Sequence, residues 1–118
     1  MEYSCVTVMP VYNEAACVER VCREWLQQMR AIGGVLLVVN DGSYDDTPRI
    51  LDRLAAGESG LIVVHQVNGG HGAAIMNGYR QALGLNPGWL FQVDSDGEMP
   101  ASLFPLIWAQ REEAAFVV

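Results

Sequence analysis

The stretch Leu90-Phe91-Gln92-Val93-Asp94-Ser95-Asp96-Gly97-Glu98 joins an apolar run with strand character to two carboxylates. Asp94 and Asp96 are two residues apart, and on an extended backbone this spacing points both side chains to the same side. Such a pair suits Mg²⁺ or Mn²⁺, because magnesium uses one or two protein carboxylates and takes its other ligands from water and phosphates. Asp-Ser-Asp-Gly also has ordinary turn composition, so the stretch alone favours a turn over a metal site.

Three further apolar, β-branched runs precede this one, at residues 4–9, 35–39 and 61–64, and helical patterns lie between consecutive runs. Strands that alternate with helices at this spacing predict a Rossmann-like α/β fold, with a mostly parallel sheet and helices on both faces. Residues 115–118 resemble the start of another strand, which would bring the sheet to about five strands. Residues 1–118 are expected to form a single domain.

The first crossover contains two local signals. Pro10 lacks the N–H group that a central strand donates, so residues from Pro10 to Glu14 are expected to form a loop, in which Asn13 caps the next helix. Gly33 is expected to end that helix. Its apolar residues recur at helical spacing, which predicts a buried stripe made of Val18, Val21, Cys22, Trp25, Leu26 and Met29.

Composition excludes several functional classes. The formal charge of −7 disfavours a nucleic-acid-binding face. All seven basic residues are arginine, and the absence of lysine excludes a Walker-A phosphate loop and Schiff-base chemistry. Cys5, Cys17 and Cys22 lack zinc-site spacing and are expected to be core residues in a reducing compartment. Without an apolar run of roughly 18–20 residues or a signal segment, the chain is expected to be soluble and cytoplasmic.

Polar residues cluster where the predicted strands end, which is where parallel sheets bind ligands. The Asp41 carboxylate could accept a hydrogen bond from a base or sugar, or belong to a simple turn. Residues 68–72 could connect two elements flexibly, or present free N–H groups to a phosphate at a helix start. His71 could contact that phosphate or lie in solvent. Tyr12 could stack on a base or cover the core edge, and Glu14 could merely favour a helix N-terminus.

Together, these loops resemble those of the family 2 glycosyltransferases of GT-A fold. Each motif is weak alone, but four occur in the family's order at the family's strand ends and cover essentially the whole chain. The motifs are Pro10-Val11-Tyr12-Asn13-Glu14, Asn40-Asp41-Gly42-Ser43 with Asp45-Asp46-Thr47, Asn68-x-Gly70-x-Gly72-x-Ala74 with Gly78 and Ala82, and Asp94-Ser95-Asp96-Gly97-Glu98.

The resemblance implies the donor half of an enzyme that transfers sugar with inversion from a UDP- or GDP-sugar, using Mg²⁺ or Mn²⁺. It places Asp41 against the base, and it makes Asp94 and Asp96 the metal ligands, with Asp96 in direct contact. It implies a nucleotide-binding set made of Pro10, Tyr12, Glu14, Asp41, Gly70, His71, Gly72, Asp94 and Ser95.

The sequence departs from the family pattern at two places. Glu98 stands where many relatives have glutamine, which leaves its role open. The chain ends at Val118, where relatives continue into the acceptor half that carries the general base. We therefore expect weak binding of nucleotide and metal, little transfer by this chain alone, and an acceptor, lipid phosphate or saccharide, that this half does not specify. An uncovered sheet edge would also allow a homodimer.

Two other classes compete with this interpretation. A non-enzymatic receiver-like or nucleotide-sensing α/β domain would also place acids at strand ends, but the receiver pattern requires a lysine that is absent here. A sugar nucleotidyltransferase would require a glycine-rich basic loop directly after the first strand, where Pro10 to Glu14 stand instead.

Overall fold

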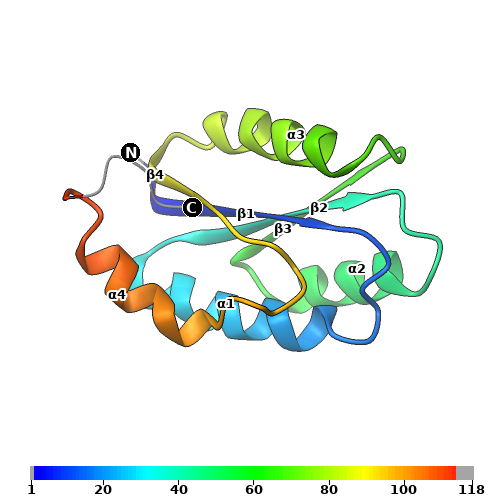
Figure 1. The fold of residues 1–118 in the computed structure, drawn as a ribbon, viewed down its shortest axis with the longest axis horizontal. Coiled ribbons are helices and arrows are strands. Elements are labelled where there is room, and N and C mark those ends of the chain that lie inside the picture. Colours follow the sequence, from blue (N-terminus) through cyan, green and yellow to red (C-terminus); the bar gives the residue numbers. More distant parts are fainter. Residues whose placement is uncertain (1, 114–118) are drawn as a thin grey trace.

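The computed structural model describes residues 2–113, which form one sheet with helices on both of its faces (Figure 1). All neighbouring strands are parallel, and the strand order is β3-β2-β1-β4. The four strands are β1 (Tyr3–Val11), β2 (Val35–Asp41), β3 (Leu61–Gln66) and β4 (Pro87–Gln92). The described sheet thus has four strands instead of about five, and the fifth strand expected at 115–118 lies outside the described residues.

One helix covers one face of the sheet and the other helices cover the opposite face (Figure 1). The lone helix is α3 (His71–Leu83). The opposite layer contains α1 (Val18–Ile32), α2 (Thr47–Gly57), a short 3₁₀ turn (Ala101–Leu103) and α4 (Phe104–Ala109). This arrangement confirms the predicted Rossmann-like α/β architecture. Among the described residues, none of the helices is long and apolar enough to cross a membrane.

The core has one part on each face of the sheet. Beneath α3, buried valines of β1 and β2 lie so close to the helix that only glycine fits at position 78, where an added Cβ would lie 2.3 Å from Val8 Cγ1. On the other face, Trp25 of α1 packs against Phe91 and Phe104, with ring centroids 5.9 and 5.6 Å away. The six residues of the predicted α1 stripe are all buried, which confirms it.

Pro10 lies inside β1, so the expectation that the strand ends before it is wrong. Pro10 pairs with Val39 of β2. On the other side of β1, the Val93 N–H donates to the Val8 carbonyl, and the pairing with β4 ends at Val8 and Gln92. Alternate residues of a strand direct their backbone groups to the same neighbour. The nitrogen of Pro10 therefore faces the side where β4 has already ended, and its missing N–H breaks no ladder bond.

Asn13 does not cap α1, which is the second local correction. The helix begins at Val18 after Cys17, and no side chain caps it. Asn13 instead adopts a left-handed backbone with φ of 53°, and its side-chain oxygen accepts a hydrogen bond from the Tyr44 N–H at 3.0 Å. Gly33, with φ of 71°, ends α1 as expected.

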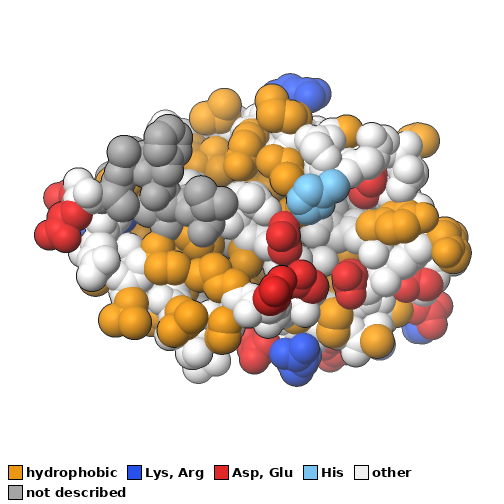
Figure 2. Space-filling model, in the orientation of Figure 1, with side chains coloured by type: hydrophobic (Ala, Val, Ile, Leu, Met, Phe, Trp, Pro, Cys, Tyr) orange, Lys and Arg blue, Asp and Glu red, His pale blue; other side chains and the backbone are white. Residues whose placement is uncertain are grey.

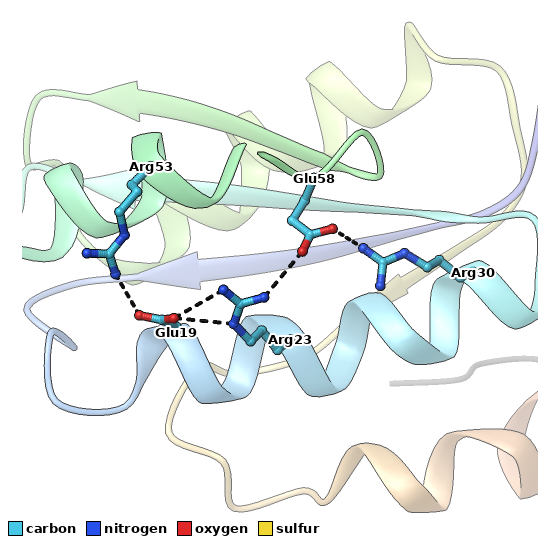
Figure 3. A network of polar contacts seen from close by, with 5 residues as sticks. All are labelled: Glu19, Arg23, Arg30, Arg53 and Glu58. Atoms are coloured by element: carbon cyan, nitrogen blue, oxygen red, sulfur yellow. Dashed lines mark hydrogen bonds and ion pairs between the residues drawn. The ribbon is translucent and has the colours of Figure 1, made fainter. Parts of the chain in front are cut away.

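The outer surfaces of α1 and α2 are joined by a network of ion pairs (Figure 3). Glu19 binds Arg53 of α2 and, as the sequence spacing indicates, Arg23 one turn along α1. Glu58, which follows α2, binds both Arg23 and Arg30. Because the arginine side chains are more than half exposed, each of these ion pairs contributes little to the stability of the fold.

All three cysteines are free thiols, but only two lie in the core. Burial raises the pKa of Cys5 to about 11 and the pKa of Cys22 to about 12, so both are protonated and inert. Cys17 is only half-buried and lies at the N-terminus of α1, contrary to the expected core position.

Candidate functional site

A cleft of about 490 Å³ lies at the carboxyl ends of the strands, where ligands bind in parallel α/β sheets. The loops that follow β1, β3 and β4 contribute to it, together with the last residue of β2. Figure 2 shows acidic side chains gathered beside a histidine near the middle of the surface in view. The cleft is lined by Pro10, Val11, Tyr12, Glu14, Asp41, Asn68, Gly70, His71, Ala74, Asp94, Ser95 and Asp96.

The loops after β1 and β2 are bound to each other by reciprocal hydrogen bonds. The Asn13 N–H donates to Ser43 Oγ at 2.9 Å, and the Tyr44 N–H donates back to Asn13 Oδ1. The Glu14 N–H donates to Thr47 Oγ1 at 3.0 Å, at the start of α2. These bonds hold the segment that carries Tyr12 and Glu14 at the cleft wall, and the Tyr12 ring, 46% exposed, is presented to solvent.

Asp45 adds a further contact between these loops. Its Oδ2 accepts from the Ala15 N–H at 3.3 Å, and its Oδ1 accepts from the Thr47 N–H at 2.9 Å. Partial burial alone would raise the pKa of Asp45, but the hydrogen bonds from Thr47 and Ala15 outweigh it and hold the pKa below its usual value. The carboxylate is therefore charged at neutral pH, and it bonds to the two loops outside the lining of the cleft.

Asp41 ends β2 and is buried, at 4% exposure. Its carboxylate accepts hydrogen bonds from the Gly69 and Gly70 N–H groups at 2.8 and 3.0 Å. Side-chain amides of Gln66 and Asn68 donate to it as well, at 2.9 and 3.4 Å. The loop that precedes α3 is thus folded around one carboxylate.

Asp94 and Asp96 follow β4 with exposed side chains, while Ser95 between them is buried. Ser95 and Asp96 lie in a turn, so strand alternation does not direct these side chains, but Asp94 and Asp96 line the same cleft. Asp94 Oδ1 accepts from Gln92 Nε2 at 3.1 Å, and Asp96 Oδ1 accepts from the Glu98 N–H at 2.9 Å. One oxygen of each carboxylate therefore has no hydrogen-bond partner among the described residues.

His71 is the first residue of α3 and connects two of the loops. Its Nε2 lies 3.5 Å from Asp94 Oδ1, and the ring is largely exposed. The N–H groups of the first helical turn, at residues 71–73, have no hydrogen-bond partner within residues 2–113, and His71 at the start of this turn lines the cleft. A helix N-terminus of this kind favours a bound anion.

A second cavity of about 290 Å³ lies on the other side of the acidic pair. Asp94 and Asp96 line both cavities, so they form the wall between them. Glu98 lines the second cavity but not the first, and its backbone N–H donates to Asp96 Oδ1.

The structure brings together all but one of the residues in the predicted site. Gly72 lies on the first turn of α3 but outside the lining of the cleft. His65, outside the lining of the cleft, contacts Asn40 of β2 and Asp52 of α2. The roles of the predicted site residues toward a ligand stay predictions.

Two residues at the site were missed by sequence reasoning. Asn68 lines the cleft and donates to Asp41, and it had only been quoted as part of a motif. Cys17 reaches the cleft margin, where its thiol donates to Glu14 Oε2 at 3.2 Å. Burial, followed by the contact with Glu14, raises the pKa of Cys17. Cys17 directly precedes Val18, the first residue of the buried stripe, but cysteine is not a residue type that indicates a helix start.

Comparison with protein-family models gives a match over residues 6–118 to the model described as Glycosyl transferase family 2. This chain belongs to glycosyltransferase family 2. A curated family 2 relative is the undecaprenyl-phosphate 4-deoxy-4-formamido-L-arabinose transferase of Klebsiella pneumoniae subsp. pneumoniae, 30% identical over 115 residues. The match covers 94% of this chain and 34% of that protein, so the chain spans about a third of the relative's length.

Solved structures show the same fold. TarS of S. aureus in complex with UDP matches with a TM-score of 0.68 and 22% identity, over 92% of this chain and 33% of that one. The mannosyltransferase PcManGT from Pyrobaculum calidifontis, in complex with GDP-Man and Mn²⁺, gives a TM-score of 0.59 and 24% identity, over 69% and 25%. At these identities the likeness concerns the fold alone, and it confirms the GT-A fold expected for a family 2 chain.

The acidic pair fits a divalent cation of the kind that the family 2 resemblance implies. Within residues 2–113, no group of three or more His, Cys, Asp or Glu side chains converges on a metal position. A site built from Asp94 and Asp96 would therefore take its remaining ligands from water and from ligand phosphates, which is how magnesium is usually bound. The free oxygen on each carboxylate supplies the hard donors that Mg²⁺ and Mn²⁺ prefer.

Proposed function

We propose that this chain is the donor-binding part of an inverting glycosyltransferase that uses a nucleotide diphosphate sugar, a UDP- or GDP-sugar, together with Mg²⁺ or Mn²⁺. The observation that carries the proposal is the convergence on one cleft of an aromatic ring, a free helix N-terminus and two carboxylates with unshared oxygens. These three features match the three parts of a nucleotide diphosphate with its metal: the base, the phosphates and the cation.

The nucleoside is assigned to the end of the cleft formed by the β1 loop. Tyr12 is exposed and held from behind by the Asn13 and Glu14 hydrogen bonds, so its ring offers a face for stacking on a base. Its ring also meets Tyr44 edge to face, with centroids 6.1 Å apart. Pro10 and Glu14 complete this wall.

The diphosphate is assigned to the space between the α3 N-terminus and the acidic pair. The N–H groups that begin α3 favour negative charge there. His71 lies between them and Asp94 and provides a donor on the same side. Asp94 and Asp96 would hold the cation, which when bound neutralises the charge that develops on the leaving diphosphate.

The sugar is assigned to the second cavity, because this cavity lies across the acidic pair from the nucleoside. Glu98 lines it and is available to accept hydrogen bonds from sugar hydroxyls. A lipid phosphate is the acceptor class that we favour over a saccharide, supported by the name of the 30% identical relative. We further propose that the reaction takes place in the cytoplasm, and that this chain, which spans about a third of the length of its 30% identical relative, transfers little sugar by itself.

Calorimetric titration tests the donor site. We expect UDP or GDP to bind in the presence of Mn²⁺, and ADP to bind more weakly. Chelation with EDTA, or the substitution Asp96→Ala, should weaken binding by about tenfold or more, since a charge-assisted contact to phosphate is lost. Asp52→Asn is the matched control, because it also removes one carboxylate but lies beside His65, away from the cleft.

Equal affinity with and without chelator, together with an Asp96→Ala protein that binds like Asp52→Asn, would contradict the metal-bridged site. Failure of the wild-type chain to bind any nucleotide diphosphate would contradict the proposed function as a whole.

A further inference from the structure

Asn40 of β2 and His65 of β3 are partners in the sheet register, and their side chains meet on the face that α2 covers. Asn40 is 3% exposed, so its side-chain amide depends on partners within the protein. Asn40 Nδ2 lies 3.0 Å from His65 Nδ1, and His65 Nε2 lies 2.8 Å from Asp52 Oδ1 of α2. A continuous chain of hydrogen bonds thus runs from α2 through β3 to β2.

One main-chain group fixes the direction of every hydrogen bond in this chain. The Ser43 N–H can only donate, and it meets Asn40 Oδ1 at 3.2 Å. The other end of the amide, Nδ2, is therefore the donor that faces His65. His65 Nδ1 must accept, so the ring is neutral, and its hydrogen is on Nε2 and is donated to Asp52.

The alternative arrangements of hydrogens all bring two donors together. A hydrogen on His65 Nδ1 would point at the Asn40 Nδ2 hydrogens across 3.0 Å. If the Asn40 amide turned over to relieve this conflict, its Nδ2 would face the Ser43 N–H instead. Because an unmatched buried donor is costly, one state of the His65 ring goes with one orientation of the Asn40 amide.

Ser43 belongs to the loop that supports the first wall of the cleft. Its Oγ accepts from the Asn13 N–H at 2.9 Å, and the Tyr44 N–H donates back to Asn13 Oδ1 at 3.0 Å. Asn13 directly follows Tyr12, which lines the cleft. The Asn40 amide is therefore the point at which the sheet holds the loop on which Tyr12 depends.

We propose that His65 is a positioning residue for the wall that carries Tyr12. With its hydrogen on Nε2, the ring keeps the Asn40 amide in the orientation that binds Ser43, and it thereby holds loop 42–46 in shape. His65 acts without touching a ligand, because it lies outside the lining of the cleft. The part that concerns nucleotide affinity rests on the function proposed above.

Nitrogen-15 NMR of the imidazole rings tests the hydrogen-bond directions without any nucleotide. At about pH 8 the wild-type His65 ring should carry its hydrogen on Nε2 alone. The only other histidine of the chain, the largely exposed His71, serves as the internal reference. Asn40→Asp replaces the donor Nδ2 by an oxygen and should draw a hydrogen onto Nδ1. Asp52→Asn keeps an oxygen for the Nε2 hydrogen and should leave the wild-type pattern unchanged.

Two substitutions with the same branching separate the hydrogen bond from the filling of space. His65→Asn places an amide oxygen near the position of Nδ1, whereas His65→Leu offers no acceptor. In His65→Leu the buried Asn40 amide loses its partner, and we expect the Ser43 and Asn13 amides of the ligand-free chain to exchange about tenfold faster. The affinity for UDP should fall by the same factor, because only molecules with the ordered loop are competent to bind. His65→Asn should bring both quantities back to within about threefold of wild type.

Opposite results would overturn the proposal. A wild-type His65 ring with its hydrogen on Nδ1, or a wild-type Ser43 amide without protection, removes its basis even if no variant folds. Equal exchange rates and equal UDP affinities in His65→Leu and His65→Asn would show that the side chain only fills space. A lower melting temperature of His65→Leu with unchanged affinity would limit its role to global stability. If wild type binds no UDP, the proposed function fails, and the ring state and exchange rates still decide whether His65 holds the loop.

Discussion

Gly78 is the point at which α3 touches the sheet, and we predict that Gly78→Ala moves the helix. An added Cβ would lie 2.3 Å from Val8 Cγ1 and 3.2 Å from Val39 Cγ2, whereas ordinary contact begins at 3.4 Å. Both valines are fully buried and β-branched, so their side chains have no alternative rotamer to occupy. The helix itself must therefore retreat by about 1 Å, as the shortfall in distance requires.

The expected loss of stability is about 2 kcal/mol. Overpacking a well-packed core costs roughly 1–3 kcal/mol, and this contact is among the tightest that the chain offers. Alanine regains up to about 1 kcal/mol relative to glycine inside a helix, which offsets part of the cost. Gly57→Ala at the end of α2 is the matched control, because its Cβ would meet no atom within 4 Å. That variant should be neutral or slightly stabilised.

Urea unfolding of wild type, Gly78→Ala, Val8→Ala and the double variant measures the clash as a coupling energy. Val8→Ala removes the methyl group that the new Cβ would strike, so the double variant should be more stable than the sum of the single effects by at least about 1 kcal/mol. The retreat of α3 would also shift His71 and the free N–H groups, and we expect Gly78→Ala to weaken UDP binding several-fold.

The reasoning would be refuted if the effects of Gly78→Ala and Val8→Ala on the free energy of unfolding were additive. It would also be refuted if the Gly78→Ala protein were as stable as the Gly57→Ala control. Either result would mean that α3 packs loosely enough on the sheet to accept a methyl group at position 78. Weakened UDP binding without any loss of stability would instead show that the substitution acts on the cleft by a route other than packing.

Three further predictions concern charge and reactivity. Because the pKa of Asp45 is lower in the folded protein, its charged carboxylate stabilises the fold above the unfolded pKa of about 3.9, and this stabilisation is lost as pH falls through the folded-state pKa. Urea unfolding should therefore give free energies of unfolding for wild type and Asp45→Asn that converge below about pH 4. Glu58→Gln should lower the free energy of unfolding, measured in urea, by less than about 1 kcal/mol, because the arginine partners of Glu58 are largely exposed. The difference from wild type should be smaller in 1 M salt. Iodoacetamide at pH 8 should label Cys17 first in the native protein and reach Cys5 and Cys22 only after unfolding, as mass spectrometry of digests would reveal.

The elements that local sequence determines could be predicted. The stripe from Val18 to Met29 places α1 on the sheet because burial follows helical periodicity, and a left-handed glycine at Gly33 ends it. The strand runs are apolar on both faces because helices cover both sides, which is visible in the residue types alone. From these elements and the polar loops between them, the position of the cleft follows.

The features that were missed depend on contacts between distant residues. Whether Pro10 can lie in a strand depends on how far β4 extends beside it, and β4 begins more than 70 residues later. Asn13 is a good helix cap by composition, but the Tyr44 N–H competes for its oxygen. The donors that hydrogen-bond to the Asp41 carboxylate come from residues 25 to 29 positions away, so the local sequence does not reveal them.

The central place of β1 in the sheet has a consequence for synthesis. β1 pairs with β2 on one side and with β4 on the other. During synthesis, β1 is therefore complete well before its partner β4 has been added. At roughly 5–20 residues per second, a ribosome needs on the order of ten seconds to add the residues between them. Throughout that interval one edge of β1 is open, and the two carboxylates after β4 do not yet exist. The acidic wall of the cleft is thus the last part to be assembled, and a nascent chain that pairs β1 with another partner would lose it first.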